Sequence, residues 1–351
     1  MNLTQSKTDF TADQARAIAF CCPRCKGELE PGNDRYRCPA CRQDYPVILG
    51  IPDFRVFPDP YISLEEDRSK GLYLFEHSRG LDFEGLLRLY WSITPEVSAR
   101  RAEDFIQRAL SLDRLGEEQL ARFDFIGSCL EIGCATGGLL IAAGGKCSRA
   151  VGVDIAFRWL AIARLRLESL GLQVPLVCAC GEALPFKNDT FDVILANDVL
   201  DHLDDQGAAL REWYRVGHDG GQLVMTTPNR FSLAREPHVQ VWGVGLLPRG
   251  LMKPYVRFVR GVPYEHLKLV SYVELRRLLN EHGFEDHEVT APALTESHTN
   301  RLSTIGKAAA RAYGQMRLIP GLRAGLLFFG PLLEVNARIC KGFSLLKNGE
   351  D

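Results

Sequence analysis

The chain has 351 residues, a length that indicates roughly two domains, and a hydrophobic fraction of 46%, which is enough for a sizeable buried core. Its 42 Lys and Arg residues against 44 Asp and Glu residues give a net charge of -2, so the chain is not a strongly basic nucleic-acid-binding protein. The composition also excludes disordered and fibrous classes.

The expected compartment rests on the absence of targeting features, and the expected redox state rests on the distribution of the cysteines. Residues 1–14 contain no apolar stretch of the kind found in signal peptides. The most apolar uncharged stretch, residues 324–333, is far shorter than the roughly 18 to 20 residues that cross a bilayer. Of the 11 cysteines, four form CxxC pairs and the others are scattered through apolar runs. We expect a cytoplasmic protein with reduced thiols and a bound metal.

Residues 1–55 are expected to form a zinc ribbon. Two CxxC pairs, separated by residues 26–37, offer four thiolates from tight turns, which matches the tetrahedral preference of zinc. The ligands predicted from this spacing are Cys22, Cys25, Cys38 and Cys41. The neighbouring Cys21 would give a looser CxxxC turn. Four protein ligands leave no open position, so this zinc should be structural.

The segment CPRCKGELEPGNDRYRCPACRQDYPVILGIPDF resembles the small zinc-ribbon family that includes the activator subunit of tRNA and protein methyltransferases. The likeness extends through Tyr45-Pro46 and Gly50-Ile51-Pro52. In that family the ribbon binds or stabilises a methyltransferase, so the resemblance implies that a methyltransferase domain follows.

Residues 56–126 are expected to form a helical bridge or cap. Pro95 can open a helix in which Val97, Arg101, Phe105, Ala109 and Leu112 share one face.

Residues 127–295 alternate short apolar runs with amphipathic stretches, which predicts an α/β fold with a doubly wound, mostly parallel sheet. An insert at about 228–270 breaks the alternation. A helix then ends near Gly283, and the segment DHEVTAPAL should be a late strand that closes the sheet. Residues 296–351 are expected to be an amphipathic C-terminal tail.

A glycine-rich loop, residues 131–138, follows the first apolar strand of this domain and opens a helix. Asp154 ends the next strand, where a carboxylate can accept both ribose hydroxyls of an adenosine-containing cofactor. Glu131 would repel the pyrophosphate of a dinucleotide. It would instead attract the ammonium and sulfonium charges of S-adenosylmethionine.

The motifs ExGxxxG, VGVD, GEALPF, FDVILAND and LREWYRVGHDGGQLVMTTPNR resemble, in this order, the class I S-adenosylmethionine-dependent methyltransferases of Rossmann-like fold, particularly the UbiE and UbiG-like (type 11) group. Ala135 replaces a frequent glycine, and Cys180 replaces an aspartate near the adenine. The resemblance implies these cofactor-binding residues: Glu131, Gly133, Ala135, Gly137, Asp154, Ile155, Cys180, Gly181, Glu182 and Asn197.

Asp198 and His202 are the candidate catalytic residues, because they follow the fourth strand, and a histidine there could remove a proton from an acceptor hydroxyl. Residues 198–202 also resemble the ExxEH signature of UbiG-type enzymes, which implies a second divalent cation at Asp198, Asp201 and His202. His202 could equally cap a helix or pack beside the cofactor. His238 and Trp242, in the insert, are candidate substrate residues.

We therefore predict methyl transfer to a hydroxyl oxygen of a small-molecule, lipid-linked or glycan acceptor. An rRNA guanine methyltransferase of RlmA-like type is one alternative, although the ribbon is nearly neutral, and a non-catalytic scaffold that binds a protein partner is another. The basic and apolar residues of the tail suit peripheral contact with the inner face of a membrane, a helix packed on the core, or a dimer surface. The oligomeric state stays open.

Overall fold

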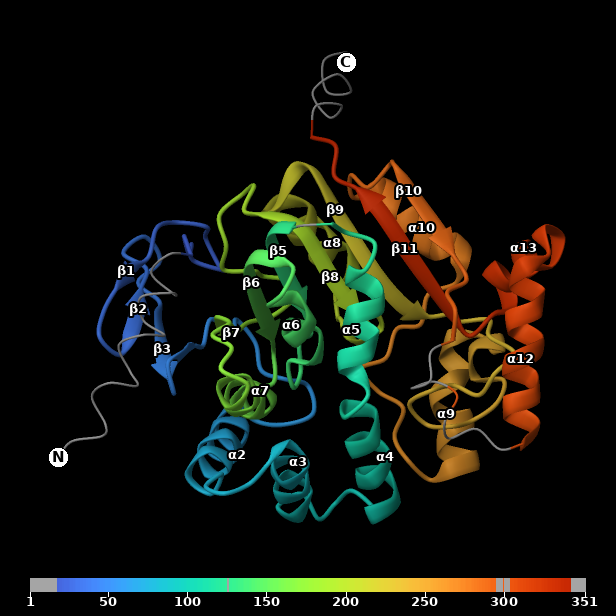
Figure 1. Ribbon diagram of the computed structural model, residues 1–351, viewed down its shortest axis with the longest axis horizontal. Coiled ribbons are helices and arrows are strands. Elements are labelled where there is room, and N and C mark those ends of the chain that lie inside the picture. Colours follow the sequence, from blue (N-terminus) through green and yellow to red (C-terminus); the bar gives the residue numbers. More distant parts are fainter. Residues whose placement is uncertain (1–17, 125, 295–298, 300–303, 342–351) are drawn as a thin grey trace. The chain divides into compact units, whose positions relative to one another are not determined.

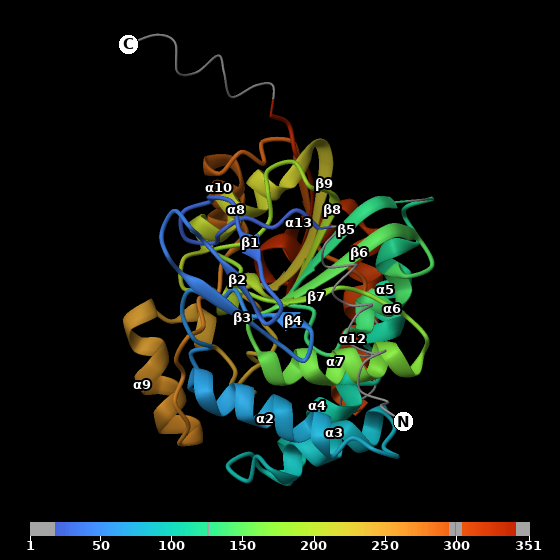
Figure 2. The ribbon, with the colours of Figure 1, turned by 90° about the vertical axis from the view of Figure 1, so that its left-hand side faces the viewer.

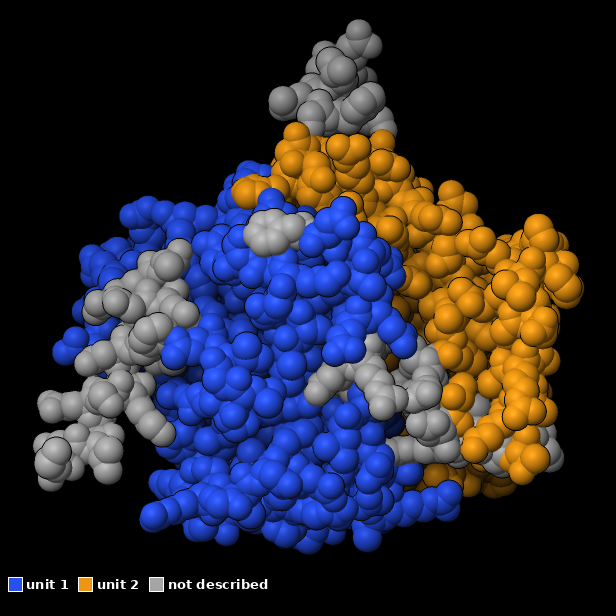
Figure 3. Space-filling view, in the orientation of Figure 1, with its two compact units in different colours: residues 1–194 blue, residues 195–351 orange. Residues whose placement is uncertain are grey.

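The computed structural model describes residues 18–124, 126–294, 299 and 304–341 (Figure 1). Residues 1–14, on which the expected absence of a signal peptide rests, lie outside the described residues. The chain divides into two compact units, residues 1–194 and 195–351, which are coloured separately in Figure 3.

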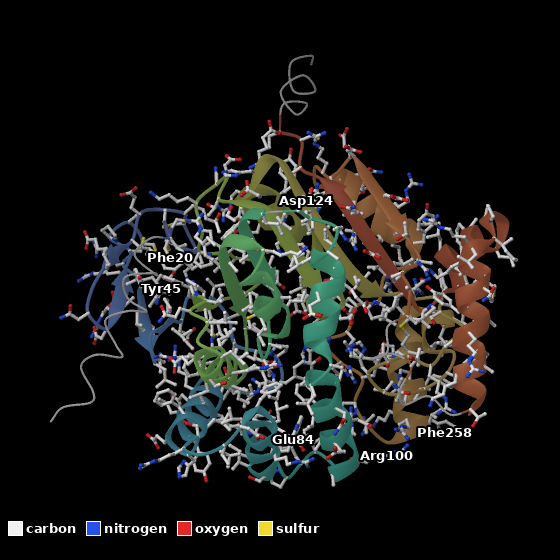
Figure 4. All side chains as sticks on the ribbon, in the orientation of Figure 1. Phe20, Tyr45, Glu84, Arg100, Asp124 and Phe258 are labelled. Carbon is white, nitrogen blue, oxygen red and sulfur yellow. The ribbon has the colours of Figure 1, made fainter. Side chains whose placement is uncertain are left out.

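A small antiparallel sheet with the strand order β1-β2-β3-β4 forms the N-terminal ribbon, residues 18–55. Leu49 and Gly50 connect β3 to β4, and both have positive φ angles, 51° and 68°, as a two-residue hairpin requires. The ring of Phe54, which is fully buried, packs 5.0 Å from Phe20 and 5.2 Å from Tyr45. Phe20 and Tyr45 are labelled in the ribbon in Figure 4. The strands are β1 (Glu30–Pro31), β2 (Arg35–Arg37), β3 (Asp44–Ile48) and β4 (Ile51–Pro52).

Four helices follow the ribbon: α2 (Leu64–Glu76), α3 (Phe83–Ser92), α4 (Ala99–Ala109) and α5 (Leu112–Leu120). The prediction that a helix opens at Pro95 is wrong, because α4 begins after its N-cap Ser98, a residue type that suits that position. Its buried face consists of Ala102, Ile106 and Ala109, whereas Arg101 is exposed. The helical character expected for this segment is nevertheless present.

The main sheet has the strand order β10-β11-β9-β8-β5-β6-β7. Strands β5, β6 and β7 are parallel, with helices between them in the chain, and this confirms the predicted α/β class with its mostly parallel sheet. The strands β5 and β8 are buried almost throughout, as in a sheet covered on both faces. The elements are β5 (Ile126–Ile132), α6 (Gly138–Ala143), β6 (Cys147–Asp154), α7 (Phe157–Ser169), β7 (Leu176–Cys178) and β8 (Phe191–Asn197).

In the second unit, β11 pairs antiparallel with both β9 and β10. The predicted late strand is present as β10 at the edge, but it pairs with β11, which the sequence analysis did not identify. Thus residues 332–338 of the expected tail belong to the sheet. The elements are η1 (Leu200–His202), α8 (Gln206–Val216), β9 (Gly217–Pro228), η2 (Val244–Leu246), α9 (Arg249–Arg260), α10 (Tyr272–Glu281), β10 (His287–Thr290), α12 (Thr304–Leu318), α13 (Pro320–Phe329) and β11 (Leu332–Arg338). Among the residues that the structure describes, no helix has the length and apolar character needed to cross a membrane.

Backbone hydrogen bonds join the ribbon to the parallel sheet within the first unit. The N–H of Phe54 donates to the carbonyl oxygen of Cys178 at 2.7 Å, next to a parallel bridge between Asp53 and Cys178. The N–H of Cys21 donates to the carbonyl oxygen of Pro185 at 2.9 Å. The chain after β4 therefore extends the edge of the sheet beyond β7.

A buried ionic network lies where α2 packs against α7; the two helices run side by side in Figures 1 and 2. We call it the Asp67 network, and it consists of Asp53, Arg55, Asp59, Asp67 and Arg158. Asp67 accepts from Arg55 Nη1 at 2.6 Å and from Arg158 Nη1 at 2.7 Å. Arg158 Nη1 also lies 2.9 Å from Asp59 Oδ2, and Arg55 Nη2 lies 2.6 Å from Asp53 Oδ2. The network links the ribbon, α2 and the start of α7.

Candidate functional site

The loop after β5 has an unusual backbone. Gly133, Ala135 and Gly137 have φ angles of 74°, 42° and 78°, in the left-handed region that glycine adopts without strain. Alanine at position 135 therefore carries a steric cost. The N–H groups of residues 133 and 134 both donate to the carbonyl oxygen of Val153, at 2.8 Å and 3.0 Å. These bonds tie the loop to β6.

Asp154 at the end of β6 supports the loop with its side chain. One carboxylate oxygen accepts from the N–H of Ala135 and the other from the N–H of Ala156, both at 2.8 Å. Burial raises the pKa of Asp154 to about 6, although these two hydrogen bonds act in the opposite direction. Each oxygen keeps a lone pair for a further donor.

Glu131 lies at the end of β5 with only 5% of its surface exposed, and its Oε2 atom has no hydrogen-bond partner among the described residues. Burial and the nearby charge of Asp154 raise the pKa of this carboxyl to about 8. Two neighbouring carboxyl groups with raised pKa values form a site that favours a positively charged ligand.

The other predicted cofactor residues of the first unit surround the ends of β6 and β7. The carbonyl oxygen of Ile155 accepts from Arg55 Nη1 at 3.0 Å. Cys180 is buried, its Sγ lies 3.5 Å from the carbonyl oxygen of Phe57, and burial raises its pKa to about 11. It is therefore a neutral thiol near neutral pH. Gly181 is buried and Glu182 is half-buried.

These residues fit S-adenosylmethionine in two respects. The unpartnered Glu131 oxygen could accept from the methionine ammonium group, which would remove a costly buried acceptor. The Asp154 carboxylate could accept the ribose hydroxyls with its remaining lone pairs. The thiol of Cys180 is a weak partner for the adenine amino group, so that contact would depend on backbone groups.

Asn197 ends β8 and Asp198 follows it, and both side chains contact the hydroxyl of Thr226. The Thr226 hydroxyl lies 3.1 Å from Asn197 Oδ1 and 3.4 Å from Asp198 Oδ1. Asp198 is exposed and has a φ angle of 52°. Three nearby side chains of the second unit form a group that could hold a metal ion, and the Asp198 carboxylate does not belong to it.

That group comprises Asp201, His202 and His238, and together with Glu236 we call it the histidine cluster. His202 Nε2 and His238 Nε2 lie 3.1 Å apart, and His238 Nε2 lies 3.4 Å from Asp201 Oδ2. His238 Nδ1 lies 2.6 Å from Glu236 Oε1. Burial raises the pKa of Asp201. Burial alone would lower the pKa of His238, but the contacts with Glu236 and Asp201 outweigh it, so the pKa of His238 is raised. The structure thus joins His238, predicted as a substrate residue, to the two predicted cation ligands Asp201 and His202.

Trp242, the other predicted substrate residue, is 57% exposed, and its Nε1 donates to the carbonyl oxygen of Leu233 at 3.0 Å. The cluster that contains His238 does not include it.

The four predicted zinc ligands come together in the ribbon, with their sulfur atoms within 4.8 Å of one another. The two CxxC turns have matching geometry. The N–H of Lys26 donates to the carbonyl oxygen of Cys22, and the N–H of Arg42 donates to the carbonyl oxygen of Cys38, each at 2.8 Å. Both donor residues have φ angles of 60°. Cys21 is separate, because its thiol donates to the carbonyl oxygen of Phe186 at 3.0 Å. The all-thiolate donor set fits a zinc ion with no open position.

Removal of this metal should destabilise the first unit. We expect Cys38→Ser to release one zinc ion per chain and to lower the midpoint of thermal unfolding, because metal binding and folding are coupled in such small units. Metal analysis and calorimetry test this, with Cys340→Ser, a half-buried thiol of the second unit, as the control. An unchanged zinc content in Cys38→Ser would contradict the ligand assignment.

Comparisons with known proteins indicate the family of this domain. Residues 130–225 match the family model described as "Methyltransferase domain", so the chain carries a class I S-adenosylmethionine-dependent methyltransferase domain. The ubiquinone biosynthesis O-methyltransferase of Idiomarina loihiensis is 26% identical over 158 residues, which cover 45% of this chain and 61% of that protein. The enzyme of the same name from Thiobacillus denitrificans is 29% identical over 167 residues, covering 46% and 66%.

The chain spans less than two thirds of the length of these curated relatives. Among solved structures, a methyltransferase from Thermotoga maritima is 20% identical, with a TM-score of 0.44, and the match covers 68% of this chain and 95% of that one.

Two buried acidic residues were missed by the sequence analysis, one in each unit. Glu236 stands two residues before His238, and this short spacing between a carboxylate and an imidazole was an available signal. Asp67 lies in a helical stretch beside two other acidic residues, Glu65 and Glu66, and nothing in that pattern separates the buried residue from its exposed neighbours.

Proposed function

We propose that the chain transfers the methyl group of S-adenosylmethionine to a hydroxyl oxygen of a small-molecule, lipid-linked or glycan acceptor. The observation that carries the proposal is the buried carboxylate of Glu131 near Asp154, whose Oε2 atom has no hydrogen-bond partner among the described residues, within a domain of the methyltransferase family. A buried acceptor of this kind calls for a cationic ligand, and the ammonium and sulfonium groups of this cofactor are cationic.

The reaction is a displacement at the methyl carbon. A lone pair of the acceptor oxygen forms the new O–C bond, the C–S bond breaks, and its electron pair stays on sulfur to give an uncharged thioether. The hydroxyl proton must leave, and we propose that the histidine cluster binds this hydroxyl and assists its deprotonation. Within the second unit, Asp201 and His202 of the cluster follow the carboxyl end of β8, the end at which sheets of this type bind ligands.

Two further points support the acceptor class. The curated relatives are named as O-methyltransferases of ubiquinone biosynthesis, and by analogy the acceptor here is a hydroxyl compound. Exposed apolar side chains on α13, among them Leu322, Phe328 and Phe329, support a peripheral membrane contact, and such a contact suits a lipid-linked acceptor. In the expected tail this contact falls to α13, because β11 is a mostly buried strand of the sheet.

Cofactor binding provides the first test. S-adenosylmethionine at a hundredfold excess over its dissociation constant should stabilise the zinc-loaded wild type by about 2.7 kcal/mol, a shift of a few degrees in the unfolding midpoint. Asp154→Ala should abolish this shift, because it removes the acceptor proposed for the ribose and the support of the loop. Glu168→Ala, a partly exposed carboxylate at the end of α7, should retain it.

A wild type that shows no shift with either S-adenosylmethionine or its demethylated product would favour the scaffold alternative. Salt-dependent binding of rRNA together with cofactor binding would favour the guanine alternative.

A further inference from the structure

We propose that Asp201, His202 and His238 bind one divalent transition-metal ion, with Glu236 as the residue that positions His238. The role of this ion, binding the acceptor hydroxyl, rests on the proposed function and deepens it. The ion itself is inferred from the geometry of the second unit alone.

The distances between the three donor atoms suit a shared ion. Metal–ligand bonds of about 2.0–2.2 Å at tetrahedral or octahedral angles place two donor atoms about 3.0–3.5 Å apart. Two of the three separations fall in this range: 3.1 Å between the two Nε2 atoms and 3.4 Å from His238 Nε2 to Asp201 Oδ2. The third, from His202 Nε2 to Asp201 Oδ2, is 3.9 Å. A small rotation of the half-exposed His202 ring would close it.

The carboxylate of Asp201 provides independent evidence for a ligand. The side chain is completely buried, yet neither oxygen accepts a hydrogen bond from the other described residues. A buried carboxylate without donors is costly, and a cation bound to it would offset that cost.

Glu236 prepares His238 to act as a ligand. The Glu236 carboxylate, 3% exposed, is itself fixed, because its Oε2 accepts from the N–H groups of His238 and Val239 at 2.9 Å and 2.7 Å. Its Oε1 lies 2.6 Å from His238 Nδ1. When Nδ1 donates to this carboxylate, Nε2 carries the lone pair and faces His202 and Asp201. Carboxylates behind metal-binding histidines orient the ring and raise its basicity in the same way.

The donor set indicates the class of metal. Two imidazoles and one carboxylate suit zinc, manganese, iron or cobalt, whereas magnesium prefers oxygen ligands. Three protein ligands leave positions open for a further oxygen ligand. The side chains of His202 and His238 are 36% and 23% exposed, so such a ligand could enter from solvent. A bound hydroxyl would lose its proton more readily.

This ligand set differs from the one that the motif at residues 198–202 implies. Asp198 is exposed and lies by the hydroxyl of Thr226, and His238, from the segment after β9, takes its place. The replacement of a carboxylate by an imidazole shifts the preference from magnesium toward transition metals.

Cobalt binding tests the inference on the full chain with zinc already in the ribbon. Equilibrium dialysis should find one additional Co2+ per chain, with an absorption spectrum of nitrogen and oxygen ligands that lacks thiolate charge-transfer bands. We expect Asp201→Asn and His238→Ala to weaken Co2+ binding at least tenfold. Glu236→Gln should weaken it about 10- to 100-fold while all three ligands remain.

His266→Ala is the matched control, because His266 is a partly exposed histidine of the same segment outside the cluster, and it should bind Co2+ like the wild type. Binding that is absent in the wild type, or equal in all variants, would overturn the metal inference. If the cofactor-induced thermal shift persists in that case, the methyltransferase proposal stands without the metal. If Co2+ binds but the cofactor shift is absent, the metal inference stands and the proposed function fails.

Discussion

Replacing Asp67 by alanine should lower the free energy of unfolding by about 3–5 kcal/mol, the usual cost of removing one partner from a buried ion pair. Asp67 is completely buried and contacts both Arg55 and Arg158, whose side chains are 1% and 9% exposed. Without the carboxylate, two buried guanidinium groups lose a charged acceptor at once. Asp53 and Asp59 remain, but they already form ion pairs with Arg55 and Arg158, respectively.

The same substitution should weaken cofactor binding. The Asp67 carboxylate also accepts from the N–H groups of Phe157 and Arg158, at 2.8 Å and 3.2 Å, so a residue of α2 caps the first turn of α7. That turn directly follows Asp154 and Ile155. Loss of a helix cap costs about 1 kcal/mol, and here the loosened turn is the one that holds the predicted ribose ligand.

Urea unfolding and titration with S-adenosylhomocysteine would measure both effects. Glu65→Ala is the matched control, since Glu65 lies in the same first turn of α2 but is exposed, and it should change the stability by less than about 0.5 kcal/mol. A stability of Asp67→Ala within that margin of the wild type would mean that the network contributes little beyond what hydrophobic packing supplies.

The features that could be predicted from the sequence are those set by local spacing. The CxxC turns require only four residues each, and the loop from Glu131 to Gly138 joins a buried strand to a helix within one short segment. Their backbone conformations and their nearest partners are largely determined within the segment. For this reason the spacing of the cysteines is sufficient to predict which four thiols lie together, and the spacing of the glycines is sufficient to predict the loop between β5 and α6.

The features that were missed depend on contacts between distant segments. The strand β11 follows two helices at the end of the described chain, and its pairing with β9 and β10 cannot be read from an apolar run of this length. The sequence places His238 only in a candidate substrate region, because the insert has no periodicity that shows which way its side chains point. Its partner His202 lies 36 residues earlier, and only the folded chain joins them.

Glu131→Gln should make the ligand-free protein more stable above pH 8 while it weakens cofactor binding. The pKa of Glu131 is about 8 in the folded protein against an ordinary value of 4.5. Between these values the folded chain holds a proton that the unfolded chain has released, so the stability of the wild type falls as the pH rises. At about 1.4 kcal/mol for each pH unit, the loss above pH 8 reaches at most about 5 kcal/mol. Glutamine cannot ionise and avoids this loss.

The two effects have one cause, which is the reason to measure them together. A carboxylate that is unfavourable in the empty site becomes favourable beside the ammonium group of the cofactor, and a hydrogen bond to a charged group contributes about 1.5–3 kcal/mol. We therefore expect affinity for S-adenosylmethionine to fall about 10- to 100-fold in Glu131→Gln, while calorimetry from pH 5 to pH 9 shows a flatter stability profile. Glu168→Gln, at the partly exposed end of α7, should leave both quantities unchanged. A variant that binds the cofactor normally yet gains stability at high pH would show that Glu131 is buried for a reason other than cofactor recognition.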